Sequence, residues 1–219
     1  ERGRKVNNTP CGEWALQRDQ RGSGTRKIVR LTLCFLEKGS AEMARLREKF
    51  NFETGALAAV RDAAREATGA YQDAARALDT LKEHVLIILG MPQTAEVIHR
   101  LAHTMPVQFD KIGDLLHQRH IEQIYPATEE CRQRPENLDD VFEEVIGLLE
   151  GIEKALRRCV EESDRNGLYP LGRGFENLQM ENSEQYEKFL YAWQMYSEHE
   201  MSATSFEGWI EEVFEKDGE

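Results

Sequence analysis

Apolar and small residues recur along residues 53–90 at alternating steps of three and four, the spacing of a helix face turned toward a partner helix. This seam consists of Leu57, Val60, Ala64, Ala67, Tyr71, Ala74, Leu78, Leu81, Val85 and Ile88. A helix over this span would be about 55 Å long, at about 1.5 Å per residue. Gly90 and Pro92 are expected to end it. The sequence therefore predicts a long helix that packs against another helix.

A second seam with the same spacing follows Asn137 and consists of Leu138, Phe142, Val145, Leu149, Ile152, Leu156 and Cys159. Asn137 is a favourable N-cap, and the signs of the charges at both ends match the helix dipole, with Asp139 and Asp140 in the first turn and Arg157 and Arg158 near the end. We expect the two seams to pair antiparallel and to form the spine of the molecule. The alternative is a homodimer in which a seam meets its own copy.

The other segments are shorter and are separated by proline and glycine. Residues 41–50, 94–104 and 107–125 show helical spacing, with breaks expected at Pro106 and Pro126. Residues 28–36 fit a strand or a helix, and we favour a helix or an edge segment that covers the core. Strand-like alternation is otherwise scarce. The predicted class is all-α: an elongated helical bundle built on a long antiparallel coiled-coil-like helix pair, with short flanking helices.

The domain organisation follows from composition. Residues 1–25 are predicted to be a flexible basic arm, 26–166 a helical bundle and 167–182 a loop containing Pro170, Gly172 and Gly174. Residues 183–219 form an acidic, aromatic helical segment. No apolar run is long enough to span a bilayer, and the four cysteines are far apart in sequence, so we expect a reduced cytoplasmic protein with no membrane contact.

Charge divides the chain more sharply than its net value of −12 suggests. Residues 1–50 carry 12 basic and 6 acidic side chains, whereas residues 136–219 carry 7 and 22. Such asymmetry determines the sign of the charge on the partners that each end of the chain attracts. The basic end can meet nucleic acid or an acidic surface through Arg2, Arg4, Lys5, Arg18, Arg21, Arg26, Lys27 and Arg30, and the acidic end should repel nucleic acid.

Aromatic residues concentrate near the C-terminus, where helical spacing places them on common faces. Because aromatic anchors dominate the energetics of interfaces, we predict a partner-binding surface there. The alternative is that these side chains pack on their own domain. The candidate residues are Tyr186, Phe189, Trp193, Phe206, Trp209, Ile210 and Phe214.

The histidines are the only residues in this sequence whose spacing suggests a catalytic site. Glu96 with His99, and Asp114 with His117, form carboxylate-x-x-His steps, which on facing helices can hold two metal ions. His103 and His120 follow about one turn later. The two steps are not level if the chain reverses at Pro106, so we favour surface histidines over a metal site. Serine-hydrolase, zinc-protease and nucleotide-loop motifs are absent, and no catalytic residue or cofactor is assigned.

Three functions remain after these observations. The favoured one is a non-enzymatic protein–protein interaction module, a helical scaffold or regulatory subunit of a larger intracellular complex. The second is a nucleic-acid-associated subunit that uses the basic arm, whose binding would weaken steeply with salt. The third is a metal-dependent helical-bundle enzyme built on the histidines.

Overall fold

A computed structural model of the chain describes residues 55–127, 135–199 and 201–215. Contacts divide the chain into two units, Glu1–Phe50 and Asn51–Glu219, and all described residues belong to the second. The predicted basic arm, the segment 28–36 and the helix 41–50 lie outside the described residues. The described helices, in chain order, are α2 (Gly55–His84), the π-helical turn η1 (Val85–Leu89), α3 (Pro92–His117), α4 (Leu138–Arg165), α5 (Tyr169–Glu198) and α6 (Ala203–Glu215).

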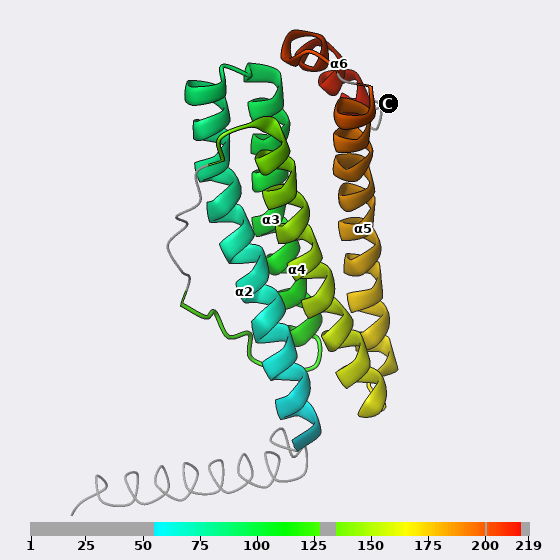
Figure 1. The fold of residues 1–219 in the computed structure, drawn as a ribbon. Coiled ribbons are helices and arrows are strands. Elements are labelled where there is room, and N and C mark those ends of the chain that lie inside the picture. Colours follow the sequence, from blue (N-terminus) through cyan, green and yellow to red (C-terminus); the bar gives the residue numbers. More distant parts are fainter. Residues whose placement is uncertain (1–54, 128–134, 200, 216–219) are drawn as a thin grey trace, which may run out of the picture. The chain divides into compact units, whose positions relative to one another are not determined.

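The four long helices form two antiparallel hairpins, α2 with α3 and α4 with α5 (Figure 1). The chain leaves α3 at one end of the bundle and enters α4 at the other, so α3 and α4 run in the same direction (Figure 1). A parallel pair of helices needs a connection that crosses the length of the bundle, and residues 118–127 are the first described part of that connection. The short helix α6 lies at the end of the bundle where α2 meets α3 (Figure 1). The predicted all-α bundle is confirmed.

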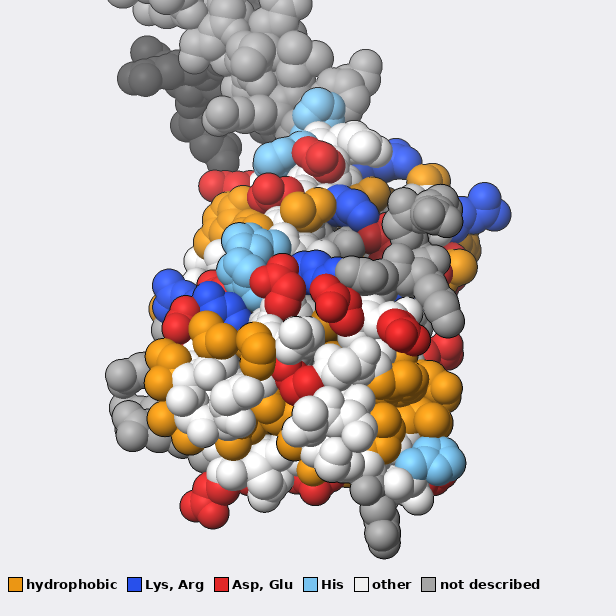
Figure 2. All heavy atoms as spheres, turned by 90° about the horizontal axis from the view of Figure 1, so that it is seen from above, with side chains coloured by type: hydrophobic (Ala, Val, Ile, Leu, Met, Phe, Trp, Pro, Cys, Tyr) orange, Lys and Arg blue, Asp and Glu red, His pale blue; other side chains and the backbone are white. Residues whose placement is uncertain are grey.

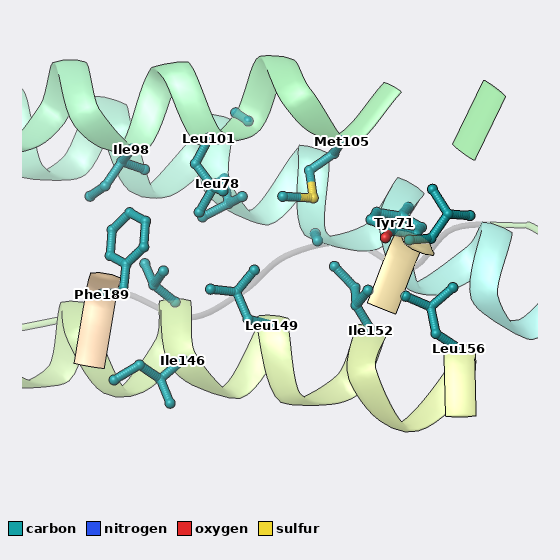
Figure 3. Close-up of a cluster of buried hydrophobic side chains, with 14 of the residues drawn as sticks. Tyr71, Leu78, Ile98, Leu101, Met105, Ile146, Leu149, Ile152, Leu156 and Phe189 are labelled. Carbon is teal, nitrogen blue, oxygen red and sulfur yellow. The ribbon is translucent and has the colours of Figure 1, made fainter. Parts of the chain in front are cut away.

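The first apolar seam is buried along α2, as the spacing predicted. Val60, Ala64, Ala67, Tyr71, Ala74, Leu78, Leu81 and Val85 are all buried, and Leu57 packs partly buried at the end of the core. Figure 3 shows Tyr71 and Leu78 of α2 pointing into the interior toward residues of α3 and α4, among them Leu101 and Leu149. Burial of this face holds α2 in place in the bundle.

The prediction for Ile88 was wrong, because its side chain is 65 % exposed. The last turn of the helix, Val85–Leu89, is π-helical. Each residue of a π-helical turn rotates by a smaller angle about the helix axis than a residue of an α-helix does. The seam positions after Val85 therefore no longer point toward the core. Gly90 then adopts a left-handed conformation (φ 66°) and Pro92 begins α3, so the predicted stop is confirmed.

The second seam is buried along α4 from Leu138 to Cys159, and the Asn137 side chain accepts a hydrogen bond from the Asp140 amide as the N-cap. Its antiparallel pairing with α2 is also confirmed. Near one end, the His84 ring nitrogen Nε2 lies 2.6 Å from the Pro135 carbonyl oxygen. Toward the other end, Arg158 of α4 pairs with Glu66 of α2. Apart from the exposed Ile88, both seams are packed within this bundle and are not available to a second copy while the bundle is closed.

Helix α3 is continuous through Pro106, which corrects the predicted break at this position. Pro106 is exposed, while Met105 and Ile112 on either side are buried. Burial of both halves on one core offsets the roughly 3 kcal/mol that an internal proline costs a helix. The helix also ends at His117 rather than near Tyr125. His120 has a positive φ of 57°, and the Ile121 amide donates to the Leu116 carbonyl oxygen, which closes the helix end.

Residues 169–182 belong to α5, so the loop predicted at 167–182 was wrong except at its start. Its glycines serve close packing inside a helix. A Cβ atom on Gly174 would lie 2.4 Å from Leu115 Cδ2 of α3, and one on Gly172 would lie 3.0 Å from Asp164 Oδ1. Pro170 lies in the first turn, where its missing amide has no intrahelical acceptor to lose.

The connection from α3 to α4 packs against the first hairpin. The Gln123 side chain is buried, and its amide nitrogen donates to the Thr68 hydroxyl (3.2 Å) and to the Phe109 carbonyl oxygen (2.9 Å). Pro126 contacts Gly69, where a Cβ atom would come within 2.8 Å of the proline ring. Gly69 in the middle of α2 therefore allows this close approach.

Candidate functional site

The predicted aromatic surface is largely part of the bundle core. Phe189, Phe206 and Ile210 are buried, so this conformation does not offer them to a partner. The Phe206 ring contacts Phe142 of α4 in an edge-on arrangement (centroids 5.7 Å apart), and the Phe189 ring lies 4.8 Å from that of Phe214. The alternative reading of the sequence, packing on the chain's own domain, is correct for these three residues.

The other four candidates, Tyr186, Trp193, Trp209 and Phe214, are partly buried against the same core. Two of them direct their polar atoms to α4: the Tyr186 hydroxyl donates to Glu150 (3.1 Å), and the Trp193 indole donates to Asp139 (2.9 Å). Desolvation, followed by the Glu150 hydrogen bond and charge, raises the pKa of Tyr186. Their partner binding remains a prediction.

Helix α6 is fixed to the start of α3 by one carboxylate. Glu207 accepts hydrogen bonds from the backbone amides of Gln93 (2.8 Å) and Thr94 (2.9 Å), and also from the Thr94 hydroxyl. These amides belong to the first turn of α3, which has no intrahelical acceptors for them and carries the positive end of the helix dipole. Glu207 thus caps α3 from a distant part of the chain, and the α6 aromatics lie at the same end of the bundle as η1.

A group of exposed apolar residues lies beside this cap, at the turn η1. Ile87 is 69 % exposed, Ile88 65 % and Leu86 43 %, and we call these three residues the apolar tip. Figure 2 looks onto this end of the bundle and shows orange hydrophobic side chains at its surface. Ile88 was predicted to lie in the core, and the apolar tip was not predicted. The signal was available in Val85–Leu89, because five consecutive apolar residues cannot all share one helix face.

Polar groups also bridge α3 and α5 at partly exposed positions. The Lys111 ammonium is 2.5 Å from Glu181 Oε2, and the Gln108 amide donates to the same oxygen (2.7 Å). On α4, Glu153 Oε1 accepts from Gln179 of α5. The Tyr71 hydroxyl is buried without a hydrogen-bond partner, and desolvation, together with the charges of Glu181 and Glu153, raises its pKa.

These bridging residues do not fit a two-metal centre. Helical bundles hold two metal ions with glutamates and Glu-x-x-His pairs that project inward from facing helices. Here the cation next to Glu181 is the chain's own lysine. Within residues 55–127, 135–199 and 201–215, no group of three or more His, Cys, Asp or Glu side chains is arranged to hold a metal ion.

The two carboxylate-x-x-His steps lie on one continuous helix rather than on facing helices, because Pro106 does not break α3. His99 and His117 are therefore separated by about 27 Å along the helix axis, at about 1.5 Å per residue. The bimetallic arrangement considered for them does not form. His99 and His103, however, lie in direct contact, with ring nitrogens Nε2 3.1 Å apart.

None of the helices in the described ranges is long and apolar enough to cross a membrane. A groove of about 670 Å³ lies between α2 and α4 beside the crossing connection, and its lining includes Asp62, Glu66, Asp73, Pro126 and Lys154. The lining combines small residues with charged ones.

Comparison with known proteins identifies the fold and no closer relationship. No known protein family matches the sequence, and no curated protein matches it. Among solved structures, the chain is similar to M. penetrans ferritin with a TM-score of 0.64 and 11% sequence identity; the match covers 70% of this chain and 94% of that one. This likeness establishes that the described bundle has a ferritin-like arrangement of helices.

Proposed function

We propose that this chain is a protein–protein interaction module, a helical scaffold or regulatory subunit of a larger complex. The observation that carries the proposal is the apolar tip. Folded monomers leave single apolar residues exposed, but three consecutive large aliphatic side chains at the end of a bundle are typical of a contact surface. The apolar tip directly follows a helix whose apolar seam is packed in the core. Its exposure is therefore not the result of a poorly packed helix.

The neighbouring part of the same end supports this proposal. Tyr191 of α5 is 49 % exposed, and its ring lies 5.9 Å from that of Trp209 in α6, which is itself partly exposed. Helix α6 also exposes Glu212 and contains no lysine or arginine. A complementary partner would offer an apolar pocket for the tip and a basic rim for α6. Such an arrangement combines aromatic and aliphatic anchors with charge complementarity.

The test is affinity purification of the full chain from its native cell, with quantitative mass spectrometry of the bound proteins. The informative variant is Ile87→Asp with Ile88→Asp, which places charge on the apolar tip. The matched control is Val107→Asp, because Val107 is also apolar and 55 % exposed but lies further along α3. Circular dichroism would check that both variants keep the helical fold.

We expect at least one protein to co-purify with the unaltered chain and with Val107→Asp, and to be lost with the charged tip. A second variant, Trp209→Ala, would tell whether α6 belongs to the same surface. Partners that remain bound to the charged tip, or that are lost equally with the control, would contradict the proposal. Sedimentation velocity would show whether the partner is a second copy of this chain. The nucleic-acid alternative depends on the basic arm, outside the described residues, and stays a prediction.

A further inference from the structure

Two histidines on the surface of α3 have the geometry of a chelating pair. His99 and His103 are one helical turn apart, their ring centroids are separated by 4.3 Å and their planes are inclined by 75°. Their Nε2 atoms, 3.1 Å apart, face each other. His103 is exposed and His99 is partly exposed, so solvent reaches the pair. When both rings are neutral, one Nε2 carries a proton and donates it to the lone pair of the other, which accounts for this contact.

A carboxylate on the adjacent helix lies behind this pair. Asp79 Oδ1 of α2 is 3.8 Å from Nδ1 of His99, the ring nitrogen on the side away from His103. That nitrogen is buried and has no hydrogen-bond partner. The distance is that of an electrostatic contact, and the Asp79 side chain, which is 63 % exposed, is free to approach further. A proton on Nδ1 facing Asp79 leaves the lone pair of His99 on Nε2, toward His103.

We propose that His99 and His103 form a two-nitrogen site for a divalent transition-metal ion such as Zn²⁺, Ni²⁺ or Cu²⁺, with Asp79 orienting His99. Imidazole nitrogens bind Zn²⁺ at about 2.0–2.1 Å, which places two of them about 2.9 Å apart at a right angle and about 3.3 Å apart at the tetrahedral angle. The observed separation of 3.1 Å lies between these values. The metal takes the place of the shared proton, which moves to Nδ1 of His103 or to solvent.

The Asp79 contact is what distinguishes this pair from any two histidines one turn apart. In metal sites, a coordinating histidine commonly donates its other ring N–H to a carboxylate, which fixes the tautomer and raises the basicity of the ligand. Lys82, which lies near Asp79 on α2, is 2.8 Å from Glu83 and is therefore largely compensated. The site lies on the surface of the first hairpin and is separate from the Lys111–Glu181 ion pair between α3 and α5.

Two protein ligands leave the remaining coordination positions to water or to a partner. Affinity should therefore be modest and follow the order of imidazole sites, with Cu²⁺ bound more tightly than Ni²⁺ or Zn²⁺. Mg²⁺ and Ca²⁺, which prefer oxygen ligands, should not bind here.

The experiment is calorimetric titration of the metal-free full chain with ZnCl₂ and NiCl₂, repeated on His99→Ala, His103→Ala and Asp79→Asn. His199→Ala is the matched control, because His199 is exposed at the end of α5. We expect each histidine variant to lose at least tenfold in affinity, Asp79→Asn to lose about tenfold as for other outer-shell carboxylates, and the control to bind normally. Mg²⁺ should give no saturable heat.

A second readout follows the rings directly and does not depend on the other metal-binding groups of the chain. In NMR spectra, Zn²⁺ should shift the ring nitrogen signals of His99 and His103 while leaving those of His199 in place. Binding that is unchanged in both histidine variants, or an unaltered chain that binds neither metal at millimolar concentration, would overturn the proposal. Thermal melting of the variants without metal controls for altered folding.

Discussion

The helix pair α2 and α4 and the helix pair α3 and α5 are held together by different kinds of contact. α2 and α4 each bury a continuous apolar seam, and the ion pair of Glu66 with Arg158 between them lies at the surface. α3 and α5 meet instead where Gly174 leaves room for Leu115, and where Lys111 and Gln108 bind Glu181. The first pair is joined by hydrophobic area, and the second by close backbone approach and polar bridges.

The two kinds of contact correspond to different patterns in the amino-acid sequence. A seam repeats every 3.5 residues and can be recognised without knowing the partner. A close contact at a glycine is marked in the sequence only by the glycine itself, a residue that is otherwise typical of a turn. Whether the glycine indicates close packing depends on the side chain that faces it.

The largest effect is expected for Ile152→Ala in the α4 seam. Ile152 is fully buried and lies in the interior between α4 and the first hairpin (Figure 3). Truncation removes buried methyl groups and leaves a cavity, which costs about 2–5 kcal/mol of unfolding free energy. Urea denaturation followed by circular dichroism measures this loss. The exposed control Val107→Ala should change stability by less than about 0.5 kcal/mol, and equal losses in both variants would contradict the assignment of the seam as the core.

A smaller loss is expected for Gly174→Val between α3 and α5. The new side chain would overlap Leu115, since its Cβ alone would lie 2.4 Å from Cδ2. Overpacking of this kind typically costs about 1–3 kcal/mol, part of which is offset because glycine is a poor helix former. The free energy of unfolding should therefore fall by about 1–2 kcal/mol.

The matched control is Gly147→Ala in α4, where a Cβ atom would meet nothing within 4 Å. It should stabilise the chain by up to about 1 kcal/mol through helix propensity alone. Adding Leu115→Ala to Gly174→Val should restore part of the lost stability, because it removes the atoms that clash. A Gly174→Val variant as stable as the Gly147→Ala chain would show that α5 has room at this position.

The sequence was sufficient for α2 and α4 because their cores are regular. Asn137 also marked the start of α4 correctly, since its cap depends on residues within one turn. The continuity of α3 through Pro106 and of α5 through Gly172 and Gly174 was not predictable from local patterns. In both, tertiary packing outweighs a local preference to end a helix, and the packing partners lie on other helices.

The candidate surface was only partly recognisable. Aromatic spacing located the face of α5 and α6 correctly but could not tell an exposed face from a buried one, so Phe189, Phe206 and Ile210 were assigned to binding although they are buried. The apolar tip was missed because its exposure results from a π-turn, which shifts the register of the seam. The contact between His99 and His103 follows from helical spacing alone, whereas the role of Asp79 needed the packing of α2 on α3.

The smallest effect is expected for Lys111→Met, which removes the charge between α3 and α5 and keeps most of the aliphatic chain. Burial raises the pKa of Glu181, but the hydrogen bonds from Lys111 and Gln108 and the lysine charge outweigh it, so the pKa lies below its ordinary value of 4.5. A carboxyl with a lowered folded pKa contributes stability that is present above its unfolded pKa and lost as the pH falls through the folded value.

Both side chains of this pair are 42% exposed, so its loss should cost about 1 kcal/mol or less near neutral pH. The difference between Lys111→Met and the unaltered chain should shrink when urea denaturation is repeated at about pH 3, because the stability that comes from a lowered carboxyl pKa is lost as the pH falls through the folded value. Arg165→Met is the control, because Arg165 pairs with Glu162 on the same helix and bridges no helices. If the cost of Lys111→Met were the same at both pH values, the contact between α3 and α5 would depend on packing of the lysine chain rather than on its charge.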